Sequence, residues 1–136
     1  MPKIIHVLAF PNVQVLDVTG PLQVFASAND LARPQGLPVP YAARVSAAQT
    51  EPVMTTAGLA LVAELLPPAD APRDTLVIAC GWGVYGAAED PALVDWVRQK
   101  AAHSRRMTSV CTGAFLLAAS GLLAGCRAVI HWTPGL

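Results

Sequence analysis

Apolar residues gather in short runs along the chain, and the runs are separated by longer amphipathic stretches. Residues 3–10 (KIIHVLAF) are almost continuously apolar and rich in β-branched side chains, and Pro11-Asn12 closes the run. A run of this kind is typical of a strand that is buried on both faces of a parallel sheet. Residues 41–47 alternate and predict a second strand, and shorter stretches predict three more, at residues 75–79, 107–110 and 127–130. Residues 53–55 and 59–63 flank a glycine and predict a small hairpin.

The stretches between these strands predict helices. The first is expected to open at residues 19–21 (TGP), with its proline in the first turn, and to run to about residue 30. Asp90 and Pro91 have the residue types of an N-cap and a first helical position, and an amphipathic stretch follows them. Arg105-Arg106 are expected at the solvated end of that helix. Residues 113–120 predict a third helix.

Strands that alternate with helices predict an α/β fold, with a mostly parallel sheet and helices on both faces. The chain has 136 residues, which is the length of one domain over residues 1–136. Hydrophobic residues make up 54% and charged residues 13%, so a large core can form.

Charge and composition exclude several classes of function. Nine basic and nine acidic residues give a net charge of zero, so direct nucleic-acid binding by this chain is not expected. No apolar stretch reaches the roughly 20 residues of a membrane helix, and no signal-peptide cleavage site follows the first strand. We therefore expect a cytoplasmic protein without a membrane partner. The three cysteines lack metal-ligand spacing and are expected to be thiols, without a metal or cofactor.

The segment MTSVCTGAF places Cys111 between a predicted strand and a predicted helix, with Gly113 two residues later. A nucleophile on such a sharp turn projects its reactive atom above the sheet. The free N–H groups at the start of a helix favour an anion such as a thiolate. The backbone N–H groups of Thr112 and Gly81 are predicted to hold an oxyanion at this position.

Asp17 and His131 are the predicted partners of Cys111, because both follow predicted strands and sites form at the carboxyl ends of such strands. His131 would act as a base or stabilise the thiolate, and Asp17 would share a proton with the thiol. Plainer interpretations stand beside these. A free cysteine is usually a small core residue, which is our interpretation of Cys80 and Cys126, and Cys111 alone would fit it too. Asp17 could equally be a helix cap or a loop carboxylate, and His131 could be a hydrogen-bonded residue of the core or of an interface.

Three motifs together resemble the ThiJ/PfpI superfamily, part of the class I glutamine amidotransferase-like fold. They are LDVTGP at residues 16–21, VCTGAFLLAASGLLAG at residues 110–125, and the His131-Trp132 pair. The resemblance implies a flavodoxin-like three-layer sandwich and a homodimer. Members of the superfamily continue for several strands and helices after the His-Trp pair. The resemblance therefore predicts that the carboxyl-terminal part of the domain is missing here, in a fragment or a truncated frame.

Two branches of the superfamily fit this sequence. The helix that follows Asp90 and the segment after Cys111 look most like the ligand- or redox-sensing domain of AraC-type transcriptional regulators. The alternative is isonitrile hydratase, which adds water to an isocyanide and whose functional residues match Cys111, Thr112 and Asp17. Either implies a small-molecule ligand or substrate. An inactive remnant is a third reading. Where family members commonly have paired glycines, this chain has Cys80-Gly81.

Overall fold

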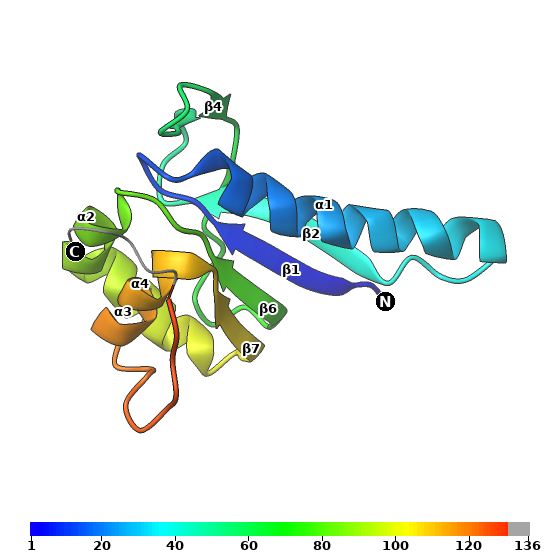
Figure 1. Cartoon of the computed structure of the whole chain (residues 1–136). Helices are drawn as coiled ribbons and strands as arrows, with labels where there is room; N and C mark the ends of the chain where they lie inside the picture. Colours follow the sequence, from blue (N-terminus) through cyan, green and yellow to red (C-terminus); the bar gives the residue numbers. More distant parts are fainter. Residues whose placement is uncertain (131–136) are drawn as a thin grey trace.

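The computed structural model describes residues 1–130, whose main feature is one sheet of five parallel strands (Figure 1). The strands are β1 (Lys3–Leu8), β2 (Tyr41–Ala47), β5 (Glu64–Leu65), β6 (Arg73–Ile78) and β7 (Ser104–Ser109). They lie in the order β5-β2-β1-β6-β7, and every neighbouring pair is parallel. This confirms the predicted α/β class, and the carboxyl ends of all five strands meet at one edge.

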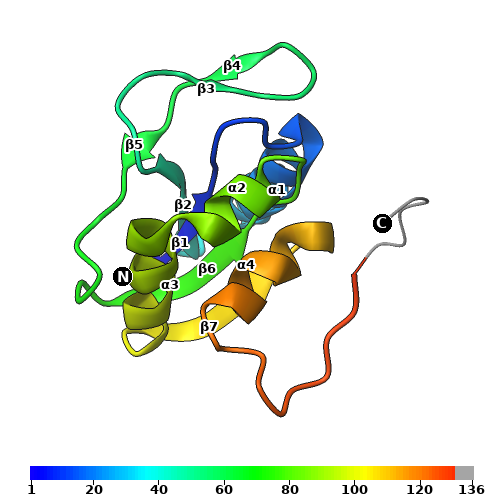
Figure 2. The same ribbon diagram turned by 90° about the vertical axis from the view of Figure 1, so that its left-hand side faces the viewer.

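Helices cover both faces of the sheet. The helices are α1 (Val15–Ala32), α2 (Val84–Glu89), α3 (Pro91–Ala101) and α4 (Ala114–Ala119), with short 3-10 turns at Arg33–Gln35 and Cys111–Gly113. Figure 2 shows α1 and α3 on opposite sides of the sheet, which makes three layers. Asp90 caps α3 as predicted, because its carboxylate accepts the backbone N–H of Ala92 at 3.0 Å.

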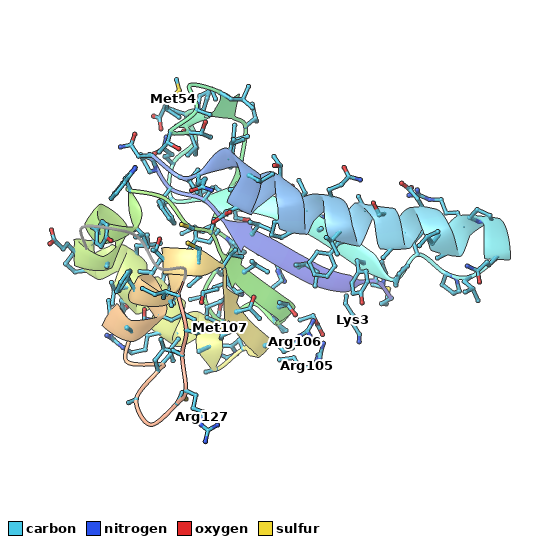
Figure 3. The ribbon with its side chains drawn as sticks, viewed as in Figure 1. Lys3, Met54, Arg105, Arg106, Met107 and Arg127 are labelled. Carbon is cyan, nitrogen blue, oxygen red and sulfur yellow. The ribbon has the colours of Figure 1, made fainter. Side chains whose placement is uncertain are left out.

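The predicted hairpin is confirmed as an antiparallel ribbon of β3 (Val53–Met54) and β4 (Ala60–Leu61). Its outer edge carries Met54, which is half exposed and stands away from the main sheet (Figure 3). Two hydrogen bonds fasten the ribbon to the loop between β1 and α1. The Asn12 N–H donates to the Met54 carbonyl at 2.9 Å, and the Thr56 N–H donates to the Val13 carbonyl at 3.0 Å.

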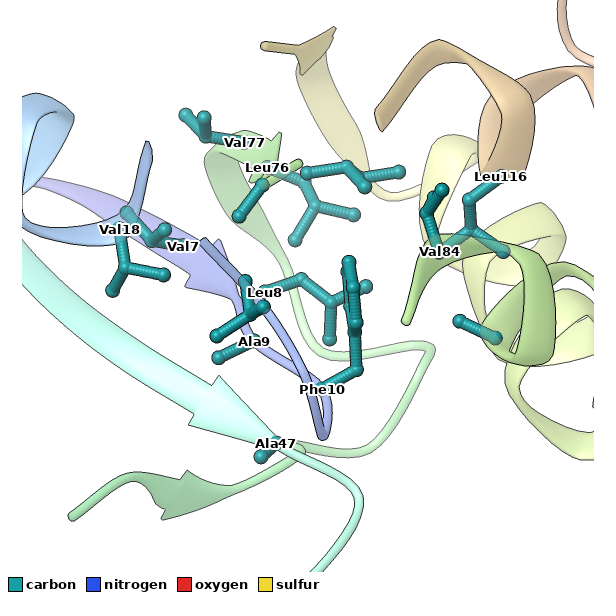
Figure 4. Close-up of a cluster of buried hydrophobic side chains, with 14 of the residues drawn as sticks. Val7, Leu8, Ala9, Phe10, Val18, Ala47, Leu76, Val77, Val84 and Leu116 are labelled. Carbon is teal, nitrogen blue, oxygen red and sulfur yellow. The ribbon is translucent and has the colours of Figure 1, made fainter. Parts of the chain in front are cut away.

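The hydrophobic core surrounds β1, the middle strand of the sheet. Ile5, Val7 and Leu8 are fully buried, as the apolar run predicted. Figure 4 shows the core residues of β1 and β6 between Val18 of α1 on one side and Val84 and Leu116 on the other. Burial of such side chains stabilises the fold by about 1.5 to 3 kcal/mol each, so the sheet is a firm base for its carboxyl edge.

The first helix begins earlier than predicted. It starts at Val15 instead of Thr19, so Pro21 lies inside the helix. Proline usually ends or opens a helix. Here the start is fixed by a tertiary bond, because the Gln14 N–H donates to the Cys80 carbonyl at 2.8 Å. The Asp17 N–H then donates to the Gln14 carbonyl at 3.1 Å, which places Asp17 in the first turn.

Two other predictions were wrong. Residues 127–130 form no strand, and Val129 is 90% exposed, because this apolar segment pairs with no strand in the described part of the chain. Arg105 and Arg106 lie in β7 and not at a helix end. Arg105 Nε donates to Asp74 Oδ1 at 2.6 Å, and this bond lowers the pKa of Asp74 to about 2. Both arginines therefore lie at the amino-terminal end of the sheet, as Figure 3 shows.

The strand β5 and the helix α2 were not predicted. Within residues 1–130 no helix is both long and apolar enough to cross a membrane.

Candidate functional site

Cys111 lies on a sharp turn between β7 and α4. Its φ is 52°, in the left-handed region that side chains with a β-carbon rarely adopt, and such strain tends to occur at functional sites. The turn is fixed by the Val110 N–H, which donates to the Ile78 carbonyl at 2.9 Å. A β-carbon at Gly113 would lie 2.5 Å from that same Ile78 oxygen. Only glycine therefore lets the turn close against β6.

Three chemically active side chains meet at this turn. The carboxylate of Asp17 and the sulfur atoms of Cys80 and Cys111 each provide an atom within 4.8 Å of the other two. They come from the first turn of α1, from the end of β6 and from the end of β7. Thr112 joins them, because its Oγ1 lies 2.9 Å from Cys80 Sγ. The structure thus brings together Asp17, Cys111 and Thr112, which the sequence had singled out, and adds Cys80.

Asp17 has a buried carboxylate oxygen close to two thiols. Its Oδ2 atom is buried and has no hydrogen-bond partner among residues 1–130. A buried oxygen without a partner costs about 1–3 kcal/mol, and more when it is charged. The two thiol sulfurs are close to it, and an S–H group is a donor that a carboxylate can accept. The predicted proton transfer between Asp17 and Cys111 stays a prediction, which this arrangement permits.

Cys80 is the site residue that sequence reasoning missed. It is 5% exposed, and burial raises the pKa of its thiol, while hydrogen bonds from Thr112 act in the opposite direction. Strand register was the signal that could have found it. Ile78 pairs with Ser109 across the parallel strands, so Cys80 and Cys111 each follow that pair by two residues.

Gly81 continues directly from Cys80 with a φ of 144°, which favours glycine. A β-carbon there would lie 2.5 Å from the Asn12 carbonyl oxygen and 2.6 Å from the Gln14 nitrogen. The segment after β6 is thus pressed against the loop that leads into α1. The oxyanion roles of Gly81 and Thr112 stay predictions, and His131 lies outside the described residues.

The cluster of Asp17, Cys80 and Cys111 is also the donor set that could hold a metal ion within residues 1–130. Two thiolates and one carboxylate would suit a soft or borderline ion such as zinc. Our sequence-based expectation of no metal and no cofactor stays a prediction.

A cavity of about 390 Å³ lies at the carboxyl ends of β1 and β2, and none of the residues that line it belongs to the cluster of Asp17, Cys80 and Cys111. Its wall is mostly apolar, with Phe10 and Leu93 among the lining residues, and its polar residues are Asn12, Gln49 and Asp90. Gly83 lines the cavity, and Gly81 follows Cys80, so one short segment borders both the cavity and the thiols. In parallel α/β sheets, ligands bind at this edge.

Three proteins are similar to this chain in sequence. An uncharacterised protein from Streptomyces lividans is 36% identical over 131 residues, which cover 96% of this chain and 89% of that protein. The isonitrile hydratase of Pseudomonas putida is 38% identical over 129 residues, covering 92% of this chain and 50% of the hydratase. An HTH-type transcriptional regulator of Mycobacterium tuberculosis is 50% identical over 52 residues, covering 38% of this chain and 20% of the regulator. The chain thus spans only half or less of the two relatives that have a described activity.

Solved structures share the fold. A ThiJ/PfpI family protein from Pseudomonas syringae superimposes with a TM-score of 0.74 at 26% identity, covering 90% of this chain and 47% of that protein. An AraC family transcriptional regulator from Pseudomonas putida gives a TM-score of 0.76 at 22% identity, covering 96% of this chain and 67% of that structure. Residues 3–135 match the DJ-1/PfpI family as a whole. The chain is a member of the DJ-1/PfpI family, as its motifs predicted.

Proposed function

We propose that this chain is the sensing domain of an AraC-type transcriptional regulator, with Cys111 at the centre of its sensing site. The observation that carries the proposal is the contact between Cys80 and Thr112, whose Sγ and Oγ1 atoms lie 2.9 Å apart. The threonine hydroxyl, which would serve a substrate in a hydratase, is bonded to a buried thiol of the chain itself. The similarity to a transcriptional regulator supports the same conclusion.

The nearby cavity supports ligand sensing. Its volume of about 390 Å³ lies in the range of small-molecule sites, about 300 to 1,000 Å³. The mostly apolar wall favours a small apolar ligand, and the Asn12 side chain would provide a hydrogen bond for one polar group, since Gln49 Nε2 already donates to the carbonyls of Glu51 and Pro52. Occupancy would press on the segment of Gly83, which continues to Cys80 and so connects the ligand to the thiols.

Isonitrile hydratase is the second candidate. The match to the Pseudomonas putida hydratase covers 92% of this chain, and Asp17, Cys111 and Thr112 lie together. In that reaction the Cys111 thiol would add to the isocyanide carbon while Asp17 moves the proton, which gives a thioimidate. Water would then add to the same carbon and the C–S bond would break, which releases the N-substituted formamide and restores the thiol.

One experiment separates the two candidates. The full chain is incubated with an alkyl isocyanide, and formation of the N-substituted formamide is followed. The sensor proposal expects no turnover. It expects instead a saturable rise in melting temperature with one member of a panel of small amides, aldehydes and isocyanides, about 5 to 10 °C at roughly a hundredfold excess over Kd. Turnover that disappears in Cys111→Ala and in Asp17→Asn would establish the hydratase in its place.

Reading the gene beyond the codon for Leu136 tests the regulator independently. A reading frame that completes the domain and continues into a helix-turn-helix segment is the expected result. A reading frame that ends after completing one domain would favour the isonitrile hydratase.

We also propose that the chain forms a homodimer through the outer face of α1. Leu16, Val24 and Leu31 on this face are 66%, 66% and 70% exposed, and contiguous exposed apolar groups mark interaction surfaces. A charge in the centre of that face, as in Val24→Glu, should convert the dimer to a monomer in light scattering. Leu37→Glu, at an exposed apolar residue outside α1, is the matched control and should leave the mass unchanged. A monomeric wild type would rule the dimer out.

A further inference from the structure

We propose that Cys111 and Cys80 form a reversible disulfide when the protein meets a hydroperoxide, so that the sensing site is a two-cysteine redox switch. The inference rests on the proposed reactive role of Cys111. It adds a resolving cysteine, and it identifies the oxidant by its chemistry.

The two cysteines follow the ends of two paired strands. Cys80 and Cys111 each stand two residues beyond the paired residues Ile78 and Ser109 of β6 and β7. Neighbouring strands lie about 4.7 to 4.9 Å apart, and disulfides join Cα atoms about 4.4 to 6.8 Å apart. The two sulfur atoms lie within 4.8 Å of each other, a gap that side-chain rotation can close.

The two thiols differ in the way that a redox pair requires. Cys111 is half-buried and Cys80 is buried, so a peroxide reaches Cys111 first. Cys80 is out of reach of bulk oxidant but lies beside the Cys111 sulfur. Asp17 adjoins both sulfurs and can take up the proton that Cys111 must release before it attacks.

The reaction balances in two steps. The Cys111 thiolate attacks one peroxide oxygen, the O–O bond breaks, and the leaving hydroxide or alkoxide takes up a proton, which gives a sulfenic acid and water or an alcohol. The Cys80 thiol then attacks the sulfenic sulfur, the S–O bond breaks, and a second water leaves with the Cys80 proton. Two thiols are oxidised by two electrons and one hydroperoxide is reduced. A dithiol reductant reverses the change.

The test uses the full chain in a Cys126→Ser background. Cys126 is exposed and is the third of three cysteines, so its removal leaves only the proposed pair. Trypsin places the two cysteines on different peptides, because Cys80 lies in residues 74–98 and Cys111 in residues 107–127. The protein is treated with stoichiometric hydrogen peroxide and a metal chelator, free thiols are blocked after denaturation, and the unreduced digest is measured by mass spectrometry. We expect the two peptides to be linked by a disulfide and to separate again with dithiothreitol. On a non-reducing gel the oxidised protein should run as a monomer, which shows that the link lies within one chain.

The matched variant is Cys80→Ser in the same background, a change of one atom that keeps a partner for Thr112. It should leave Cys111 as a sulfenic acid that dimedone traps, advancing to sulfinic acid with excess peroxide. Oxidised Cys111 together with a fully alkylatable Cys80 in the parent would overturn the switch but keep a reactive Cys111. A Cys111 that neither peroxide nor iodoacetamide modifies in the folded protein would overturn both the switch and the proposed reactive role.

Discussion

Replacing Gly83 with alanine is expected to destabilise the fold by about 3 kcal/mol or more. A β-carbon at this position would overlap the backbone carbonyl oxygen of Pro11 and lie 3.1 Å from the Phe10 ring. Neither can retreat easily, because Phe10 is 4% exposed in the core and Pro11 continues directly from it. The φ of Gly83 is −67°, which alanine adopts without strain, so the loss measures the close approach alone. Urea unfolding followed by circular dichroism gives the free energy.

Gly86→Ala is the control for this prediction. Gly86 lies inside α2, and no atom stands within 4 Å of the position of its β-carbon. Alanine there should raise stability by up to about 1 kcal/mol, because glycine is the weaker helix former. Equal effects of the two substitutions would mean that the segment from Cys80 to Gly83 is not pressed against the loop after β1. Cys80 and the wall of the cavity lie on the segment that this contact holds.

The fold was largely predictable because the central strands β1 and β6 are mostly buried. Residues 3–10 contain β1, since apolar β-branched runs have few alternatives to a central strand. Residues 41–47, which were predicted from their alternation, coincide with β2. The start of α1 was not predictable, because the Cys80 carbonyl that fixes Gln14 lies 66 residues away along the chain. Residues 127–130 were apolar enough for a strand, but strand formation also needs a neighbour that the described residues do not provide.

The site was predictable only in part, for a related reason. Cys111 was predicted because the strand, the cysteine and Gly113 follow one another in sequence, and this pattern is typical of a sharp turn from a strand into a helix. Cys80 was interpreted as a core thiol because nothing local distinguishes a buried cysteine from a resolving one. Only the register of β6 against β7 places it beside Cys111. Residues whose role depends on a partner in another strand are found once the pairing is known.

Acid should destabilise this protein through a histidine far from the site. His6 lies in the central strand and is 3% exposed. Arg73 Nε donates to His6 Nε2 at 2.9 Å, so the ring proton lies on Nδ1 and is donated to Ser46 Oγ at 2.6 Å. Burial, as the largest cause, and the nearby charges of Arg73, Lys100 and Arg44 together lower the pKa of His6 from 6.5 to about 4, against the opposing charge of Glu64.

The sign of the pH dependence follows from that lowered pKa. The unfolded chain takes up a proton on His6 below about pH 6.5, whereas the folded protein does so only near pH 4. The unfolded state therefore binds more protons between these values, and the free energy of unfolding rises with pH across this window. Between pH 4.5 and 7.5 the expected gain is roughly 2 to 3 kcal/mol. Urea titrations at several pH values measure it.

The variant His6→Gln isolates this effect. Glutamine can accept from Arg73 and donate to Ser46 but does not titrate, so its stability should be nearly constant between pH 4.5 and 7.5. Asp74, whose pKa is lowered to about 2, contributes stability that is lost only at pH below its unfolded pKa of 3.8, outside this window. A wild-type curve as flat as that of His6→Gln would mean that His6 can become protonated in the folded sheet. A positive charge on His6 would then have to lie next to Arg73 in the central strand, although the burial of His6 disfavours a charge there.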